Sequence, residues 1–230
     1  MPGGPGKPER PERTGSVDKL IEDIKDPDES GWLINHTRPA KCQVYLARKW
    51  MKKEDTEKLY DFLVENCEFR QERGKIAENE FDVPRLQFYC GDDTTRSHRY
   101  RQGDEKGTKL SDWIPELREI RDRVEEETGI HFNSCLVNYY RDGEDYIGFH
   151  GDKEVAPPLN PVFTLSLGVS RRFIFRPYKN KNSEEDIEIQ LDAGNAVLMI
   201  YETQKQYKHG IPKQLRIKNG RMSITLRVLL

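Results

Sequence analysis

The residue types best suited to chemistry gather in one short stretch of this chain, residues 146–154. His150 and Asp152 are separated there by a single glycine. In an extended strand, side chains at positions i and i+2 point to the same face. An imidazole and a carboxylate on one face supply two of the three ligands of a 2-His-1-carboxylate iron site. His209 is the best candidate for the third ligand, although His-x-Asp alone also arises by chance.

A second informative pattern lies near the C-terminus, where apolar and polar residues alternate. One face would carry Met222, Ile224, Leu226 and Val228, and the other Arg221, Ser223, Thr225 and Arg227. An ordinary half-buried strand with its polar face in water gives the same alternation. Two arginines lining a pocket would instead need anions, because an unpaired buried charge is costly. A small dicarboxylate would satisfy them through bidentate hydrogen bonds. This strand alone leaves both interpretations open.

Asn138 and Tyr140 show the same two-residue period just upstream of His150. Both side chains can hydrogen-bond a carboxylate. An asparagine is poorly placed in a central strand unless its amide is used, which favours a functional role.

The whole-chain composition limits the class of protein. The 230 residues carry 38 basic and 40 acidic side chains, a net charge of −2, so binding to nucleic acid would need a local basic patch. The four cysteines show no CxxC pair or zinc-ligand spacing, which favours free thiols in a reducing compartment. We find no signal-peptide core and no apolar stretch long enough to span a bilayer. We therefore expect a soluble intracellular protein of the nucleus or cytoplasm, without contact to a membrane.

The first part of the chain differs from the rest. Residues 1–30 are rich in proline, glycine and charge, so they form a predicted flexible tail. Residues 17–24 have helical apolar spacing and could dock on a partner, but a solvated tail fits the composition better.

A folded domain is predicted over residues 41–230. Helices are expected at residues 52–67 and 111–128, the second with Ser111 as its N-cap and Gly129 as its stop. Strands are expected at residues 42–46, 85–90, 132–140, 146–150, 162–167, 172–175, 187–191, 196–201 and 222–229. Many short strands separated by turn residues indicate a β-sandwich or barrel, with the two helices covering one outer face.

A family resemblance follows from the order of the candidate residues: Asn138-x-Tyr140, His150-x-Asp152, His209, Arg221 and Arg227. This order resembles the AlkB family of Fe(II)/2-oxoglutarate-dependent dioxygenases, in particular its animal members that repair alkylated DNA. The likeness runs from about residue 83 to residue 228. It implies an α+β, mainly β fold: a double-stranded β-helix (jelly-roll) core, N-terminal helices packed on one sheet, and a nucleotide-recognition lid.

The resemblance also implies roles for single residues. Fe(II) would be held by His150, Asp152 and His209. The cosubstrate 2-oxoglutarate would pair through its distal carboxylate with Arg221, helped by Tyr140, while Arg227 and Asn138 act at its keto-acid end. Ser223 stands where the family usually has asparagine, which puts the strength of cosubstrate binding in doubt. The implied reaction uses O2 and releases formaldehyde, succinate and CO2 from an N-methylated base.

Substrate contacts are less defined by the sequence. Glu154 matches an acidic position that faces the base in the family, which would suit cationic lesions such as 1-methyladenine and 3-methylcytosine, although a solvated loop glutamate is an equal alternative. The lid would fall within residues 86–102, where the candidates for stacking on the base are Tyr89, His98 and Tyr100. A phosphate-contacting rim is predicted around the pocket, from Arg96, Arg99, Arg101, Arg171, Arg172, Arg176, Lys179 and Lys181. Residues 73–83 show no apolar wedge, which favours single-stranded DNA or RNA.

Two alternatives to a monomeric nucleic-acid demethylase stay open. One is the same oxygenase chemistry on a protein or a small molecule. The other is a binding module that has kept the fold without the activity. The complete set of three ligands and two arginines argues against the second alternative.

Overall fold

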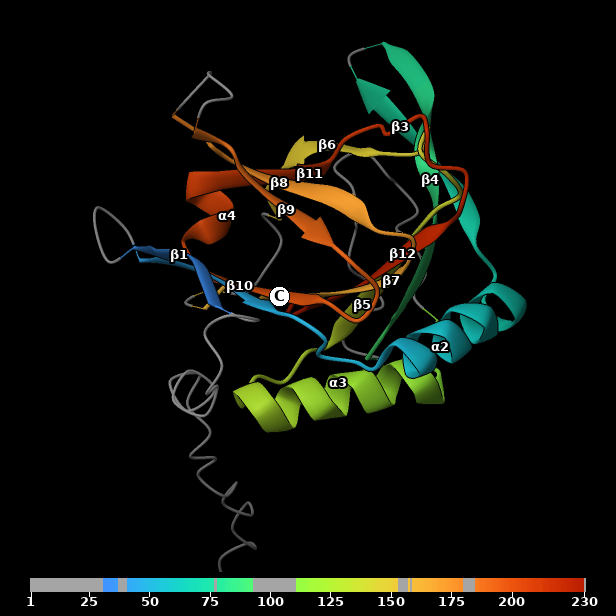
Figure 1. Cartoon of the computed structure of the whole chain (residues 1–230), viewed down its shortest axis with the longest axis horizontal. Helices are drawn as coiled ribbons and strands as arrows, with labels where there is room; N and C mark the ends of the chain where they lie inside the picture. Colours follow the sequence, from blue (N-terminus) through green and yellow to red (C-terminus); the bar gives the residue numbers. More distant parts are fainter. Residues whose placement is uncertain are drawn as a thin grey trace, which may run out of the picture.

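Two antiparallel sheets face each other in the computed structural model of this chain (Figure 1). The structure describes residues 31–36, 41–76, 78–92, 111–152, 157, 159–179 and 185–229. The predicted tail with its helix at residues 17–24, and most of the predicted lid, lie outside these ranges. Among the described helices, none has the length and apolar character needed to cross a membrane.

The larger sheet has eight strands in the order β1-β2-β10-β7-β12-β5-β4-β3. Their bounds are β1 Gly31–His36, β2 Cys42–Ala47, β3 Arg70–Ile76, β4 Asn79–Gly91, β5 Ser134–Tyr140, β7 Val162–Gly168, β10 Ala196–Tyr201 and β12 Arg221–Arg227. The smaller sheet has the order β6-β11-β8-β9, with β6 Ile147–His150, β8 Arg171–Pro177, β9 Ile187–Leu191 and β11 Tyr207–Ile211. Two facing sheets with this interleaved strand order form a double-stranded β-helix, so the predicted fold is confirmed.

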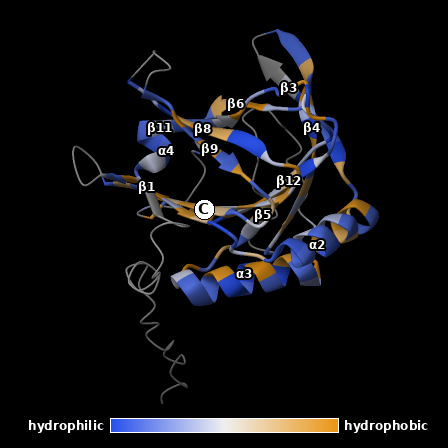
Figure 2. Cartoon of the chain, in the orientation of Figure 1, coloured by the Kyte–Doolittle hydropathy of each residue, from blue (hydrophilic) through white to orange (hydrophobic). Residues whose placement is uncertain are grey.

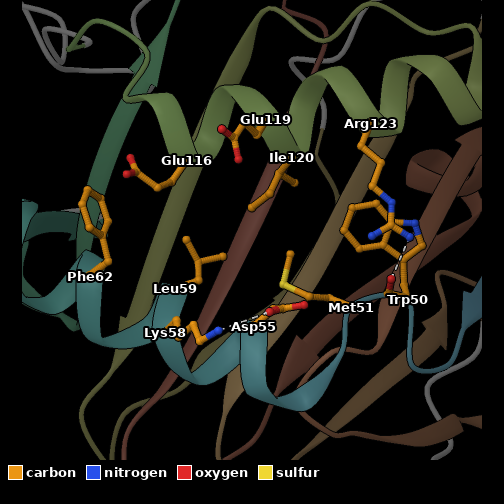
Figure 3. Close-up of a pocket in the computed structure, with 10 residues that line it drawn as sticks. All are labelled: Trp50, Met51, Asp55, Lys58, Leu59, Phe62, Glu116, Glu119, Ile120 and Arg123. Atoms are coloured by element: carbon orange, nitrogen blue, oxygen red, sulfur yellow. Dashed lines mark hydrogen bonds and ion pairs between the residues drawn. The ribbon is translucent and has the colours of Figure 1, made fainter.

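Two long helices, α2 (Lys53–Asn66) and α3 (Pro115–Thr128), cover the outer face of the larger sheet (Figure 1). Their apolar residues recur at helical spacing and pack on the sheet. The rest of each helix surface is mostly hydrophilic (Figure 2). Between the helices lies a pocket whose apolar lining includes Leu59, Phe62 and Ile120 (Figure 3). The helical layer was predicted in this place.

The core has two layers, one on each face of the larger sheet. Met222, Ile224 and Leu226 of β12 belong to the layer under the helices. Tyr140, Phe173 and other side chains fill the layer between the sheets. Because strand residues alternate, the arginines of β12 point into the space between the sheets, and all of β12 is buried. The interpretation of a polar strand face in water was therefore wrong.

Helix α3 begins later than predicted, and Ser111 does not cap it. The helix starts at Pro115 with Ile114 in an extended conformation (ψ 147°). A residue that precedes proline is sterically kept out of the helical region, so the helix cannot begin earlier. Ser111 instead forms a parallel bridge to Cys90. The predicted stop is confirmed, because Gly129 is left-handed with φ 69°.

Several elements were missed or shortened in the sequence analysis. β1, β3, β11 and the short helix α4 (Thr203–Gln206) were not predicted, and β4 begins at Asn79 rather than residue 85. β3 reads Arg-Gln-Glu-Arg-Gly-Lys-Ile and pairs with β4 in a projecting hairpin, so it lacks the apolar alternation that marks a half-buried strand.

Candidate metal centre

Three side chains from two separate parts of the chain meet at the β6 edge of the smaller sheet. His150 ends β6, Asp152 follows it, and His209 lies opposite His150 in β11. His209 Nε2 lies 3.6 Å from one Asp152 oxygen, and His150 Nε2 lies 3.9 Å from the other. Each residue offers a ligand atom within 4.8 Å of the others. These three residues were predicted as ligands from the sequence, and the structure places them close together.

A β-bulge aims His150 at this point. His209 pairs with His150 but Ile211 pairs with Ile147, so β6 has one extra residue in the ladder. Ile147 and His150 therefore both point inward. His150 Nδ1 lies 2.9 Å from the Gly148 carbonyl oxygen, which only accepts, so Nδ1 carries the proton. This leaves the lone pair on Nε2 for a metal ion.

Asp152 is almost fully buried and its two oxygens differ. Oδ1 accepts a hydrogen bond of 2.6 Å from Arg227. Oδ2 is buried and has no hydrogen-bond partner among the described residues. The Asp152 N–H donates to the side chain of Gln204, in α4, at 3.0 Å. A buried anionic oxygen of this kind is costly unless a cation binds it.

The electrostatics of the centre favour the metal-binding forms of its groups. Burial raises the pKa of Asp152, but Arg227, His209 and His150 together hold it below the ordinary value. Burial and His150 lower the pKa of His209 to about 3. At neutral pH the centre thus offers a carboxylate and a neutral imidazole, as metal ligation requires. Two imidazoles and one carboxylate with open positions fit Fe(II).

A buried cationic side chain, Arg221, lies on β12. Arg221 is 0% exposed, and its Nη2 donates to Ser166 Oγ at 2.6 Å. Its Nε and Nη1 are buried without hydrogen-bond partners in the described part of the chain. Burial lowers the pKa of Arg221 to about 10, so it keeps its charge at neutral pH. Two idle donors on one buried guanidinium fit a carboxylate.

The neighbouring strands supply the other predicted cosubstrate residues. Tyr140 lies opposite Arg221, and Asn138 lies opposite Ser223, in the β5–β12 register. Asn138 Oδ1 accepts hydrogen bonds from Arg85 at 2.7 Å and Gln87 at 3.0 Å. All these side chains point between the sheets, as the two-residue period predicted.

Several contacts of the centre were not found from the sequence. Gln204 was missed because no local pattern marks it, and Ser166 belongs to the segment Ser166-Leu-Gly168 that supports the family resemblance but was given no role. Arg85 and Gln87 alternate with Tyr89 along β4, a signal that could have placed them on the site-facing side.

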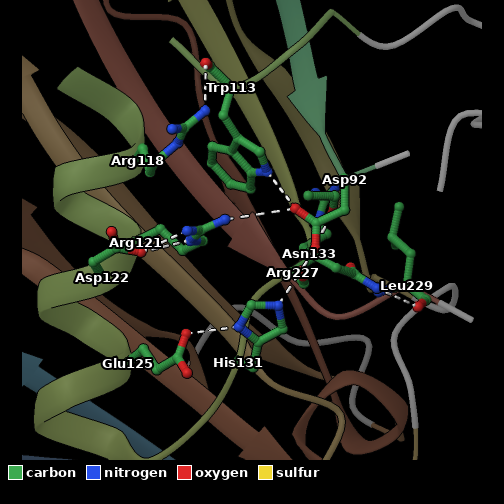
Figure 4. Close-up of polar contacts among 11 residues, drawn as sticks. Asp92, Trp113, Arg118, Arg121, Asp122, Glu125, His131, Asn133, Arg227 and Leu229 are labelled. Atoms are coloured by element: carbon green, nitrogen blue, oxygen red, sulfur yellow. Dashed lines mark hydrogen bonds and ion pairs between the residues drawn. The ribbon is translucent and has the colours of Figure 1, made fainter. Parts of the chain in front are cut away.

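A polar network holds the far end of β12 in place (Figure 4). The Asn133 N–H donates to the Arg227 carbonyl at 3.1 Å, and the Asn133 amide exchanges two 2.8 Å hydrogen bonds with the Leu229 backbone. The Asn133 carbonyl in turn accepts from the Asp92 N–H at 2.9 Å. Asp92 also accepts from Trp113, at 2.6 Å. The end of β4 and the end of β12 are thereby tied together beside Arg227.

The predicted substrate residues have different outcomes. Glu154, His98 and Tyr100 lie outside the described residues. Tyr89 is buried in β4 and packs on Leu136. Arg172 is paired with Glu188 at 2.5 and 2.6 Å. Their roles toward a substrate stay predictions.

The placement of Arg171 on the phosphate rim was wrong. Arg171 is 0% exposed. Its guanidinium donates to the carbonyl oxygens of Asp142, Asp145 and Pro212 at 2.8–2.9 Å. A buried cation needs such partners, and here they join the segment before β6 to the segment after β11. Arg171 therefore supports the fold and cannot reach a phosphate.

Comparisons with known proteins agree with this geometry. The profile of the 2OG-Fe(II) oxygenase superfamily matches residues 43–227. The chain is 34% identical over 156 residues to the DNA oxidative demethylase ALKBH2 of Bos taurus, covering 64% of this chain and 54% of that protein. It is 36% identical over 124 residues to the alpha-ketoglutarate-dependent dioxygenase alkB homolog 3 of Rattus norvegicus, covering 51% and 42%. The chain spans about half the length of the curated relatives it matches.

A solved structure supports the fold alone. The structure of OsALKBH1 superposes with a TM-score of 0.54 at 17% identity, covering 84% of this chain and 100% of that chain.

Proposed function

The chain belongs to the 2OG-Fe(II) oxygenase superfamily, and from this premise we propose that it oxidatively demethylates N-alkylated bases in nucleic acid. The cosubstrates are O2 and 2-oxoglutarate, and the products are formaldehyde, succinate, CO2 and the repaired base. One observation carries the proposal. Among the described residues, a buried carboxylate beside two imidazoles has an oxygen without a hydrogen-bond partner, and a buried arginine in the same interior has two nitrogen donors without one.

Separate residues of the chain would bind the metal ion and the cosubstrate. His150, His209 and the Oδ2 atom of Asp152 would hold Fe(II), which with 2-oxoglutarate and O2 supplies the oxidising chemistry when bound. Arg221 would bind the distal carboxylate of 2-oxoglutarate.

Arg227 would bind the keto-acid end of 2-oxoglutarate. Its hydrogen bond to Asp152 ties that end of the cosubstrate to the metal ligand. Phe173 stacks on the His209 ring at 5.5 Å and limits the access of water to this imidazole.

The names of the relatives support nucleic acid as the substrate class. ALKBH2 is named as a DNA oxidative demethylase. Cationic lesions such as 1-methyladenine and 3-methylcytosine are the proposed substrates. The preference for single strands was inferred because residues 73–83 show no apolar wedge. However, Phe81 lies in this range, in the β3–β4 hairpin, and is 42% exposed. Strand preference therefore has to be measured.

The test is mass spectrometry of methylated oligonucleotides incubated with the protein, iron, ascorbate and 2-oxoglutarate. Single- and double-stranded DNA and RNA form separate arms. We expect loss of the methyl group and matching succinate in at least one arm, and neither with Asp152→Ala. Succinate production that no nucleic acid stimulates would refute the proposal and favour a protein or small-molecule substrate.

A further inference from the structure

The smaller sheet has an outer face that the proposed reaction does not use. His209 of β11 and Phe175 of β8 are buried and point inward, toward the metal centre and the core. Because side chains alternate along a strand, Lys208 and Arg176 point outward, and the two residues are paired in the β8–β11 register. The bulge in β6 turns Phe149 toward the same outer face, since its ring contacts Arg176.

Two cation–aromatic pairs lie on this face, and a third joins the segments just outside β6 and β11, so that the three pairs follow one another along the two strands. Their distances from cation to ring centroid are 4.9 Å for Lys208 and Tyr178, 3.9 Å for Arg176 and Phe149, and 5.1 Å for Lys213 and Tyr146. Since β6 and β11 run antiparallel, Tyr146 and Lys213 lie at one end of the row and Lys208 at the other. Tyr178 is 36% exposed. We call these six residues the aromatic–basic row.

The cations of the row differ in whether their charge is already neutralised. Arg176 is paired with Asp186 at 2.6 Å, which holds the guanidinium over Phe149. Lys208 and Lys213 have no carboxylate within salt-bridge distance in the part of the chain that the structure describes. Two ammonium groups beside aromatic rings suit a strand that presents phosphates and bases together.

The row reaches the metal centre. Phe149 directly precedes the ligand His150. The Tyr178 hydroxyl lies 3.1 Å from the point where a β-carbon on Gly151 would stand, and Gly151 separates the two ligands His150 and Asp152. A strand lying on the row would therefore run along the outer face to the edge of the sheet at which His150 and Asp152 lie.

We propose that the aromatic–basic row binds the single-stranded nucleic acid that flanks the target nucleotide. This inference rests on the proposed function and adds the path of the strand. Rings in a row bind bases whose faces are free, and such faces are hidden in a duplex. Stacking and phosphate contact recognise the chemistry shared by DNA and RNA, so both form arms of the test.

The experiment measures binding of unmodified fluorescent oligonucleotides by anisotropy, without metal or cosubstrate, over a series of salt concentrations. The charge variant is Lys208→Ala/Lys213→Ala. We expect the slope of log affinity against log salt to fall by about 0.7 for each lysine removed. Lys58→Ala is the matched control, because Lys58 lies on α2 under the other sheet. Its slope should equal that of the wild type.

The ring variants test stacking separately from charge. Tyr178→Leu should weaken single-strand binding about 5-fold or more, while Tyr178→Phe keeps the ring and should bind like the wild type. Thermal melting shows that each variant is folded. Unchanged affinity and salt slope in folded variants would overturn the inference, as would an equal loss of duplex binding.

The two proposals fail in different ways. If the wild type demethylates oligonucleotides but the row variants bind them normally, the row is excluded and the function stands. If the row variants lose binding but no nucleic acid is demethylated, the function is excluded and the binding face stands.

Discussion

At the scale of single residues, the two carboxylate oxygens of Asp152 have different surroundings. One oxygen is held by Arg227 at 2.6 Å, and the other is buried beside two imidazoles without a hydrogen-bond partner among the described residues. The first contact keeps the carboxylate ionised, and the second oxygen is the one that a metal ion would take. Replacing this side chain should therefore affect both metal binding and folding.

Asp152→Asn tests both effects. The amide keeps the size of the side chain but loses its charge, so we expect Mn(II) affinity to fall more than about 100-fold. The free energy of unfolding of the metal-free protein should also fall by about 3 kcal/mol, because Arg227 loses a buried anionic partner. Calorimetric titration and urea denaturation measure the two quantities. Asp55→Asn, at an exposed pair on α2, should change neither. Metal binding at wild-type affinity in Asp152→Asn would contradict the ligand assignment.

Arg221→Gln tests the proposed carboxylate contact of this buried guanidinium. Two charged hydrogen bonds to the distal carboxylate would be lost, so 2-oxoglutarate should bind about 100-fold more weakly. A keto acid without the distal carboxylate, 2-oxobutyrate, should bind the variant and the wild type equally. Calorimetry with Mn(II) present measures both. Arg172→Gln is the control at a surface ion pair. An equal loss of affinity for the two keto acids would mean that Arg221 does not bind the distal carboxylate.

The residues of this site could be predicted from the sequence to the extent that they repeat at strand spacing. His150 and Asp152, Asn138 and Tyr140, and the two arginines of β12 all follow that rule. Gln204 could not be predicted, because its contact to Asp152 joins a short unpatterned helix to a loop. The burial of Arg171 depends on three carbonyl oxygens from distant segments, and no local signal reports them.

At the scale of elements, short irregular pieces aim the ligands. The bulge in β6 turns His150 inward, and α4 places Gln204 against the Asp152 N–H. Gly151 leaves room for α4, since a β-carbon there would lie 2.5 Å from the Gln204 carbonyl oxygen. Most strands of the two sheets were predicted, although β11, which carries His209, was missed. The bulge could not be predicted, because it depends on pairing with a partner strand that the sequence does not identify.

Gln204→Ala measures how much α4 contributes. Without the acceptor, the Asp152 backbone is less restrained, so Mn(II) affinity should fall about 10-fold, as for other residues that orient a ligand. Lys205→Ala, on the exposed side of the same helix, should bind Mn(II) like the wild type. Equal affinities for Gln204→Ala and the wild type would show that α4 does not position the carboxylate.

At the scale of the whole molecule, the larger sheet separates two functions. One face packs on α2 and α3 and stabilises the fold, and the other encloses the candidate site with the smaller sheet. Amphipathic spacing predicted the helical layer well. The division of the chain into a tail at residues 1–30 and a domain at residues 41–230 stays a prediction.

The four cysteines lie in the two core layers, so the reaction rate of their thiols measures how often each layer opens. Cys42 lies between the sheets, and Cys67, Cys90 and Cys135 lie under the helices. Burial and Glu202 raise the pKa of Cys42 to about 11, and burial raises that of Cys67 to about 12. At pH 8 the reactive thiolate form of these two residues is then about one molecule in a thousand or fewer.

We therefore expect the native protein to react very slowly with Ellman's reagent at pH 8, and all four thiols to react at once in guanidinium. Lys58→Cys places a thiol on the exposed face of α2 and should add one fast-reacting group to the native protein. Because access to the native thiols requires opening of the core, their reaction rate should rise with denaturant in parallel with the unfolded fraction. Rapid labelling of the native wild type would show that one of the two layers is open in solution.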